Sequence, residues 1–139
     1  MIVQGQCTIF KQHLLSGLEN FAAGTTYTYK IALYTADASL DSTTLVYTTS
    51  NEVVGSGYTA GGVVLIPIVP ASLGSTAYVS FNDITLTGTS FVVRGALIYN
   101  ATTNAAVAVL DFGSDKTASG NFTITFPPAT ATTAVIRFS

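Results

Sequence analysis

Apolar residues recur with a helical spacing only near the N-terminus. Between residues 8 and 21 they stand four, four and three positions apart, at Phe10, Leu14, Leu18 and Phe21. This spacing places them on one face of an α-helix. We therefore predict a helix over 8–21, with Thr8 as its N-cap and Gly24 just beyond its end. Gly17, inside the pattern, weakens the expected helix by about 1 kcal/mol relative to Ala.

Beyond Gly24 the pattern changes to the alternation of β-strands. In the segment 26–34, apolar residues occupy every second position and share one face: Tyr27, Tyr29, Ile31 and Leu33. Further strands are predicted over 42–48, around Tyr58, and over 63–69, 78–81, 91–99, 105–112, 121–126 and 133–138. Turns are predicted at 82–83, 100–104 and 113–120. About eight short, evenly spaced strands favour a single-domain, all-β, antiparallel β-sandwich with one short N-terminal helix.

The chain of 139 residues has the length of one domain. We predict an N-terminal arm over 1–24 that docks on a neighbouring subunit or a larger particle, and a β-sandwich over 25–139. The residues predicted for the core are Val92, Ile98, Val107, Val109, Phe122 and Ile124. Asp115 and Lys116 are predicted to lie in an exposed turn.

Charge is scarce along the chain. Only 9% of residues are charged, against 48% that are hydrophobic, whereas an ordinary soluble domain has roughly 25% charged residues. Such a surface protects a free monomer poorly against association, which favours a subunit of an assembly. The few basic residues are scattered, so no nucleic-acid partner is expected. The apolar run 63–69 is too short to span a membrane and contains Pro67, so no membrane partner is expected.

No catalytic or cofactor-binding residues are assigned, and we do not expect an enzyme. The only histidine, His13, lies on the predicted helix with no acidic residue beside it in sequence, which does not favour a hydrolytic triad. One histidine and one cysteine, Cys7, cannot supply the usual ligands of a zinc site. His13 is expected to face solvent or an interface, and Cys7 to be a small apolar residue. Two carboxylates, Asp111 and Asp115, flank a Gly-Ser pair and could bind calcium. The favoured interpretation is that Asp111 ends a strand and Asp115 forms an Asx-turn.

Four ordered segments carry a family resemblance that spans nearly the whole chain. They are 29–35 (YKIALYT), 48–62 (TTSNEVVGSGYTAGG), 94–100 (RGALIYN) and 106–113 (AVAVLDFG). Together they resemble the small virion structural proteins of tailed bacteriophages. Residues 63–70 (VVLIPIVP) differ from the family pattern by being more apolar.

The resemblance implies a protein made in the cytoplasm of a host bacterium and assembled into the virion. It favours a capsid decoration (cement) protein on the capsid surface, with the major capsid protein as partner and self-association as a homotrimer. The alternatives are a tail or neck component and a carbohydrate-binding β-sandwich module. The last usually presents exposed Trp, and this chain has none.

Overall fold

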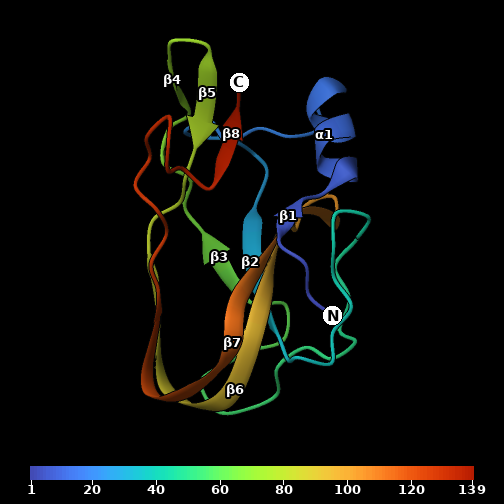
Figure 1. Cartoon of the computed structure of the whole chain (residues 1–139), viewed down its shortest axis with the longest axis vertical. Coiled ribbons are helices and arrows are strands. Elements are labelled where there is room, and N and C mark those ends of the chain that lie inside the picture. Colours follow the sequence, from blue (N-terminus) through green and yellow to red (C-terminus); the bar gives the residue numbers. More distant parts are fainter.

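The computed structural model describes residues 1–139. Its elements in chain order are β1 (Gly5–Gln6), α1 (Thr8–Leu15), β2 (Tyr29–Tyr34), β3 (Val63–Leu65), β4 (Ala71–Leu73), β5 (Thr76–Val79), β6 (Ile84–Asn100), β7 (Ala105–Ile124) and β8 (Ile136–Phe138). The strands form two antiparallel sheets (Figure 1), one in the order β1-β7-β6-β2-β3 and one in the order β4-β5-β8. The prediction of an all-β chain with one short helix is confirmed.

The strands are less even in length than predicted, because β6 and β7 form one long hairpin. The turn predicted over 113–120 is wrong, since those residues lie within β7, and β6 begins at Ile84 rather than at Phe91. Between the pairs Val93↔Lys116 and Gly95↔Asp111, two steps along β6 match five steps along β7. Residues 112–115 (Phe-Gly-Ser-Asp) therefore form a large bulge in β7 and not a chain reversal. Figure 1 shows the two strands of this hairpin, β6 and β7, bending sharply together at the bottom of the molecule.

Two predicted strands, over 42–48 and around Tyr58, are absent. Both segments belong to the long connection 35–62 between β2 and β3, whose strand-like pairing with the sheet is limited to isolated bridges such as Val46↔Ala105 and Ser56↔Ser90. This connection packs across a sheet face through its tyrosines and does not extend the sheet. As a result β2 is covered on both faces, and Ala32 and Tyr34 are as fully buried as Ile31.

The helix is shorter than predicted because Gly17 ends it. Gly17 takes a φ of +73°, and its N–H donates to the carbonyl of Leu14 at 3.3 Å. The N–H of Leu18 donates to the carbonyl of His13 at 2.8 Å. These two bonds form the Schellman motif, in which glycine commonly takes the left-handed position. The N-cap is Cys7 rather than Thr8.

One buried cluster of 29 residues forms the core. Of the six residues predicted for it, Ile98, Val107, Val109 and Ile124 are buried, and Phe122 is half-buried against them. Val92 is the error, because its side chain is 47% exposed whereas that of Val93 is fully buried. Residues 96–100 are buried on both faces of the sheet, so apolar and polar residues do not alternate there. The sequence of this segment therefore does not indicate which face of the strand is buried at position 92. Asp115 and Lys116 are exposed as predicted, but they lie on β7.

The N-terminal residues contribute to this same core. Ile2, Cys7, Phe10 and Phe21 belong to the single buried cluster, and β1 pairs with β7. This burial weighs against a separable arm over 1–24, while a docking role for the segment stays a prediction. No helix of the structure is both long and apolar enough to cross a lipid bilayer.

Candidate assembly surface

The most unusual surface of the molecule is built from a stretch without charge. Residues 53–82 contain no Asp, Glu, Lys or Arg, yet most of their side chains from 64 to 77 are exposed. The exposed large aliphatic side chains of this stretch between β3 and the end of β4 are Val64, Ile66, Ile68, Val69 and Leu73. We call residues 63–73 the apolar edge. A run of exposed aliphatic residues without charge marks an interaction site more often than a free surface.

The apolar edge includes one edge strand of each sheet. β3 is the last strand of the five-stranded sheet, and β4 is the last strand of the other. Outer strands present unpaired N–H and C=O groups, which natural proteins protect with Lys, Pro or bulges. Neither strand contains a Lys or a Pro. Pro67 and Pro70 lie only in the connection between them, where Pro67 bridges to Phe81.

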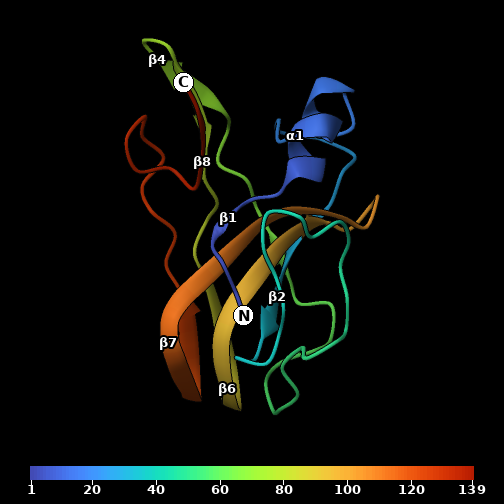
Figure 2. The ribbon, with the colours of Figure 1, turned by 45° about the vertical axis from the view of Figure 1, so that its right-hand side comes forward.

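The hairpin of β4 and β5 projects from the molecule. Its strands pair Ala71 with Tyr78 and Leu73 with Thr76, and a two-residue turn joins them. Figures 1 and 2 show this hairpin extending at the top, on the opposite side of β8 from helix α1 in Figure 1. Leu73, at the end of the hairpin, is 68% exposed.

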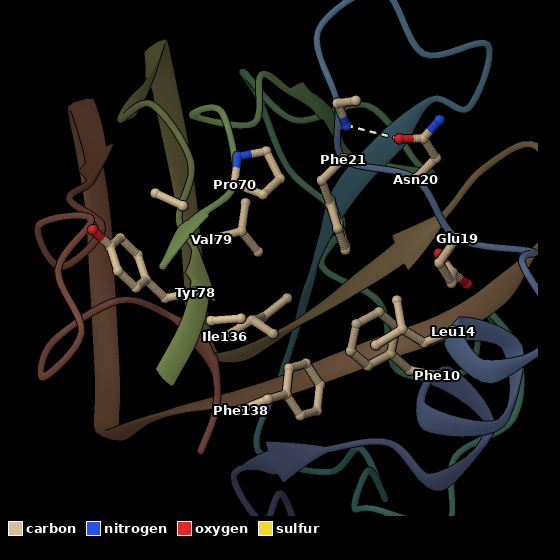
Figure 3. Close-up of a pocket in the computed structure, with 13 residues that line it drawn as sticks. Phe10, Leu14, Glu19, Asn20, Phe21, Pro70, Tyr78, Val79, Ile136 and Phe138 are labelled. Atoms are coloured by element: carbon tan, nitrogen blue, oxygen red, sulfur yellow. Dashed lines mark hydrogen bonds between the residues drawn. The ribbon is translucent and has the colours of Figure 1, made fainter. Parts of the chain in front are cut away.

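An open apolar cavity of about 290 Å³ lies beside the hairpin. Ten of its 13 lining residues are hydrophobic. As Figure 3 shows, Phe10 and Leu14 come from α1, Phe21 from the following segment, Val79 from β5, and Ile136 and Phe138 from β8. The cavity thus lies between the N-terminal helix on one side and the smaller sheet on the other.

A buried carboxyl group, that of Glu19, belongs to the lining of this cavity. Glu19 Oε2 accepts hydrogen bonds from Tyr29 Oη at 2.8 Å and from Asn100 Nδ2 at 3.3 Å. Its Oε1 has no hydrogen-bond partner and lies 3.8 Å from His13 Nδ1. Burial raises the pKa of the Glu19 carboxyl above its usual range. Because the Glu19 side chain is 0% exposed, the accessible cavity surface carries no charge. His13, expected to face solvent or an interface, is instead half-buried and faces this carboxyl group.

Asp111 and Asp115, the two carboxylates that could bind calcium, both lie within ion-pair distance of Arg94. Arg94 Nε donates to Asp111 Oδ1 at 3.2 Å, and its Nη1 lies 4.0 Å from Asp115 Oδ1. Asp111 Oδ1 also accepts the N–H of Gly113 at 2.9 Å, and both contacts lower the pKa of Asp111. The Asx-turn is thus made by Asp111 and not by Asp115. Arg94 supplies the positive charge between the two carboxylates, and no third metal-ligating side chain joins them.

A second buried acid, Glu52, lies in the segment 48–62, but the sequence analysis assigns it no role. Its carboxylate accepts hydrogen bonds from Tyr47 Oη at 2.5 Å, Tyr58 Oη at 2.9 Å and the N–H of Gly61 at 2.7 Å. Tyr99 stacks on Tyr47 with ring centroids 4.7 Å apart. The hydrogen bonds of Glu52 join separate parts of the connection 35–62 to one another, and the stacking of Tyr47 on Tyr99 attaches the connection to β6. The signal in the sequence is an acid flanked by tyrosines in an otherwise polar loop.

Comparison of the chain with protein-family models, with curated proteins and with solved structures finds no match. The case for a function therefore depends on the residues and surfaces described above.

Proposed function

We propose that this protein is a non-enzymatic structural subunit of a bacteriophage virion. In this proposal it is a capsid decoration protein that binds the major capsid protein and associates with its own copies as a homotrimer. We take its two sheets, which enclose one core, as a variant of the β-sandwich. The observation that carries the proposal is the apolar edge, a charge-free stretch in which exposed aliphatic side chains lie on the edge strands β3 and β4 and on the connection between them.

Covering the apolar edge removes its aliphatic side chains from water. Each Å² of apolar surface removed from water contributes about 25 cal/mol, and a surface without charges adds little desolvation cost. The open backbone groups of β3 and β4 can also pair with a partner strand. A partner that covers the apolar edge is therefore stabilised both by the burial of apolar surface and by backbone hydrogen bonds. The phage assignment itself comes from the sequence resemblance of the four segments between 29 and 113.

The alternatives differ in what they require of the surface. A carbohydrate-binding module stacks sugar rings on exposed aromatic side chains, whereas the large hydrophobic residues exposed here are aliphatic. A tail or neck component would use the same kind of surface as a decoration protein. Where the subunit binds in the particle distinguishes these two.

The experiment compares phage heads assembled with and without the protein. We expect heads that lack it to assemble but to rupture at lower temperature. Adding back the wild-type protein should restore the stability of the heads, and adding back an Ile66→Lys variant should not. Val54→Lys is the matched control, because Val54 is 93% exposed and lies outside the apolar edge. Equal stability with and without the protein, together with no binding to heads, would overturn the decoration role.

A further inference from the structure

We propose that residues 17–24 form a flap that opens when the carboxyl group of Glu19 loses its proton, and that this opening exposes the apolar cavity beside α1. The inference does not depend on the proposed function, because it concerns one segment within a single chain. It describes a conformational change that is controlled by pH.

Two glycines lie at the ends of the flap and allow its backbone to move. Gly17 has a φ of +73° and Gly24 a φ of +75°, and a Cβ at either position would meet no atom within 4 Å. Glycine reaches a wider range of backbone angles than any other residue. Within the flap only Glu19 and Phe21 are buried, and the other six residues are exposed. Two side chains therefore anchor the flap to the rest of the molecule.

Phe21 is the apolar anchor and forms part of the cavity wall. Its ring stacks on that of Tyr29 with centroids 4.4 Å apart, and it meets Phe10 edge to face at 5.9 Å. Phe10 and Phe21 both line the cavity, as Figure 3 shows. The burial of Phe21 favours the closed flap. Opening the flap would withdraw this ring and expose the apolar lining, including Phe10.

Glu19 is the polar anchor, and its surroundings suit a neutral carboxyl group. The groups that face it are His13 from α1, Tyr29 from β2 and Asn100 from the end of β6. Tyr29 and Asn100 donate hydrogen bonds to Oε2, whereas Oε1 has no partner. Only His13 can carry a positive charge, and its Nδ1 is 3.8 Å from Oε1, beyond hydrogen-bond distance. A negative charge on Oε1 would be buried with little compensation.

Loss of the proton therefore favours the open flap, in which water hydrates the carboxylate. Burial raises the pKa of Glu19, so the closed flap holds the proton more tightly than the open flap does. The ratio of open to closed molecules rises with pH by at most about tenfold per pH unit and levels off above the raised pKa. Burial also raises the pKa of the Tyr29 hydroxyl, so Tyr29 stays neutral while Glu19 titrates.

Hydrogen exchange on the full chain tests the flap at the amide of Asn20, which donates to Tyr29 Oη at 2.9 Å. Rates are measured by NMR from pH 5 to pH 8 and corrected for the intrinsic effect of pH. The amide of Cys7, which donates to the carbonyl of Val107 at 2.9 Å, reports unfolding of the core. We expect the Asn20 amide to be at least about tenfold less protected than that of Cys7, and its protection to fall as pH rises. Equal protection of the two amides would overturn the inference, because Asn20 would then exchange only through global unfolding.

Three variants identify the group that controls the opening. In Glu19→Gln the corrected protection of Asn20 should not change with pH. The exposed-carboxylate control Asp115→Asn and the variant His13→Gln should both keep the wild-type trend. A trend that persists in Glu19→Gln, or that disappears in His13→Gln, would overturn the inference. The wild-type profile decides by itself if Glu19→Gln does not fold, since constant protection of Asn20 from pH 5 to pH 8 would also overturn it.

Discussion

Gly62 lies against the carbonyl group of Ile31 so closely that a Cβ at position 62 would stand 1.8 Å from that oxygen. Gly62 also has a φ of +87°. It is the last residue before β3, whose first residue, Val63, pairs with Ile31. The long connection 35–62 thus returns to the sheet at a position that only glycine can occupy.

Replacing Gly62 with Ala should therefore destabilise the fold. The added carbon must displace backbone atoms of β2, and the positive φ adds strain, so we expect a loss on the order of 3 kcal/mol in the free energy of unfolding. Urea denaturation measures the loss. Gly5→Ala is the control, because a Cβ there meets no atom within 4 Å, and it should change stability by less than about 0.5 kcal/mol. Equal stability of the two variants would show that β2 and β3 do not approach as described.

The orientation of β6 predicts opposite outcomes at two adjacent valines. Val93 is fully buried, so Val93→Ala should cost about 2 kcal/mol through the loss of two buried methyl groups and the cavity they leave. Val92 is 47% exposed, and Val92→Ala should cost less than about 0.5 kcal/mol. Thermal unfolding of both variants checks this. A larger loss at Val92 would reverse the orientation assigned to this part of the strand.

The reactivity of Cys7 tests whether residues 1–24 belong to the core. The thiol is fully buried, and burial raises its pKa to about 11. A thiol reagent at pH 8 should therefore react only as fast as the whole molecule unfolds. A Ser114→Cys variant supplies an exposed control thiol that should react at once, since Ser114 lies on the exposed bulge. Rapid reaction of Cys7 in the folded wild type would mean that the N-terminal segment detaches as an arm.

The buried carboxyl group of Glu19 should lower the free energy of unfolding as pH rises. Because burial raises the pKa of Glu19 in the folded state, the folded protein holds this proton more tightly than the unfolded chain does. The contribution of Glu19 is fully present below the usual carboxyl pKa and is lost as pH rises through the raised value. Glu19→Gln has no proton to lose, so its stability relative to wild type should increase between pH 4 and pH 8. The slope from this one group cannot exceed about 1.4 kcal/mol per pH unit, and the difference should level off once pH exceeds the raised pKa.

Denaturation at several pH values measures this difference. Asp115→Asn, an exposed carboxylate, is the control and should show a smaller trend. The comparison is repeated with His13→Gln in both proteins, since His13 Nδ1 lies 3.8 Å from Glu19 Oε1. A difference between Glu19→Gln and wild type that does not vary with pH would mean that the carboxyl is solvated.

The local elements of this fold can be predicted from the sequence where one pattern dominates. The alternation at 26–34 and the paired runs near 91–99 and 105–112 correctly indicate β2 and the tip of the β6–β7 hairpin. Gly17 misleads, because a glycine within a helical pattern and a glycine that ends a helix look alike until the backbone is known. The turn predicted over 113–120 is also wrong, because the bulge between Asp111 and Lys116 contains small polar residues of the kind that form turns.

Only part of the candidate surface can be predicted from the sequence. The apolar run 63–69 can be seen, but its exposure depends on β3 and β4 being outer strands, which is a property of the sheet order. The cavity cannot be predicted, since it joins residues as distant as Phe10 and Phe138, whose ring centroids are 6.3 Å apart. Long-range packing of this kind leaves no local periodicity.

The mass of the full-length protein in solution, measured by sedimentation equilibrium over a range of concentrations, tests the central claim most directly. The account predicts a closed oligomer, expected to be a trimer, that is weakened by Ile66→Lys in the apolar edge but not by Val54→Lys outside it. A wild-type protein that stays monomeric at every concentration and also fails to bind phage heads would contradict it.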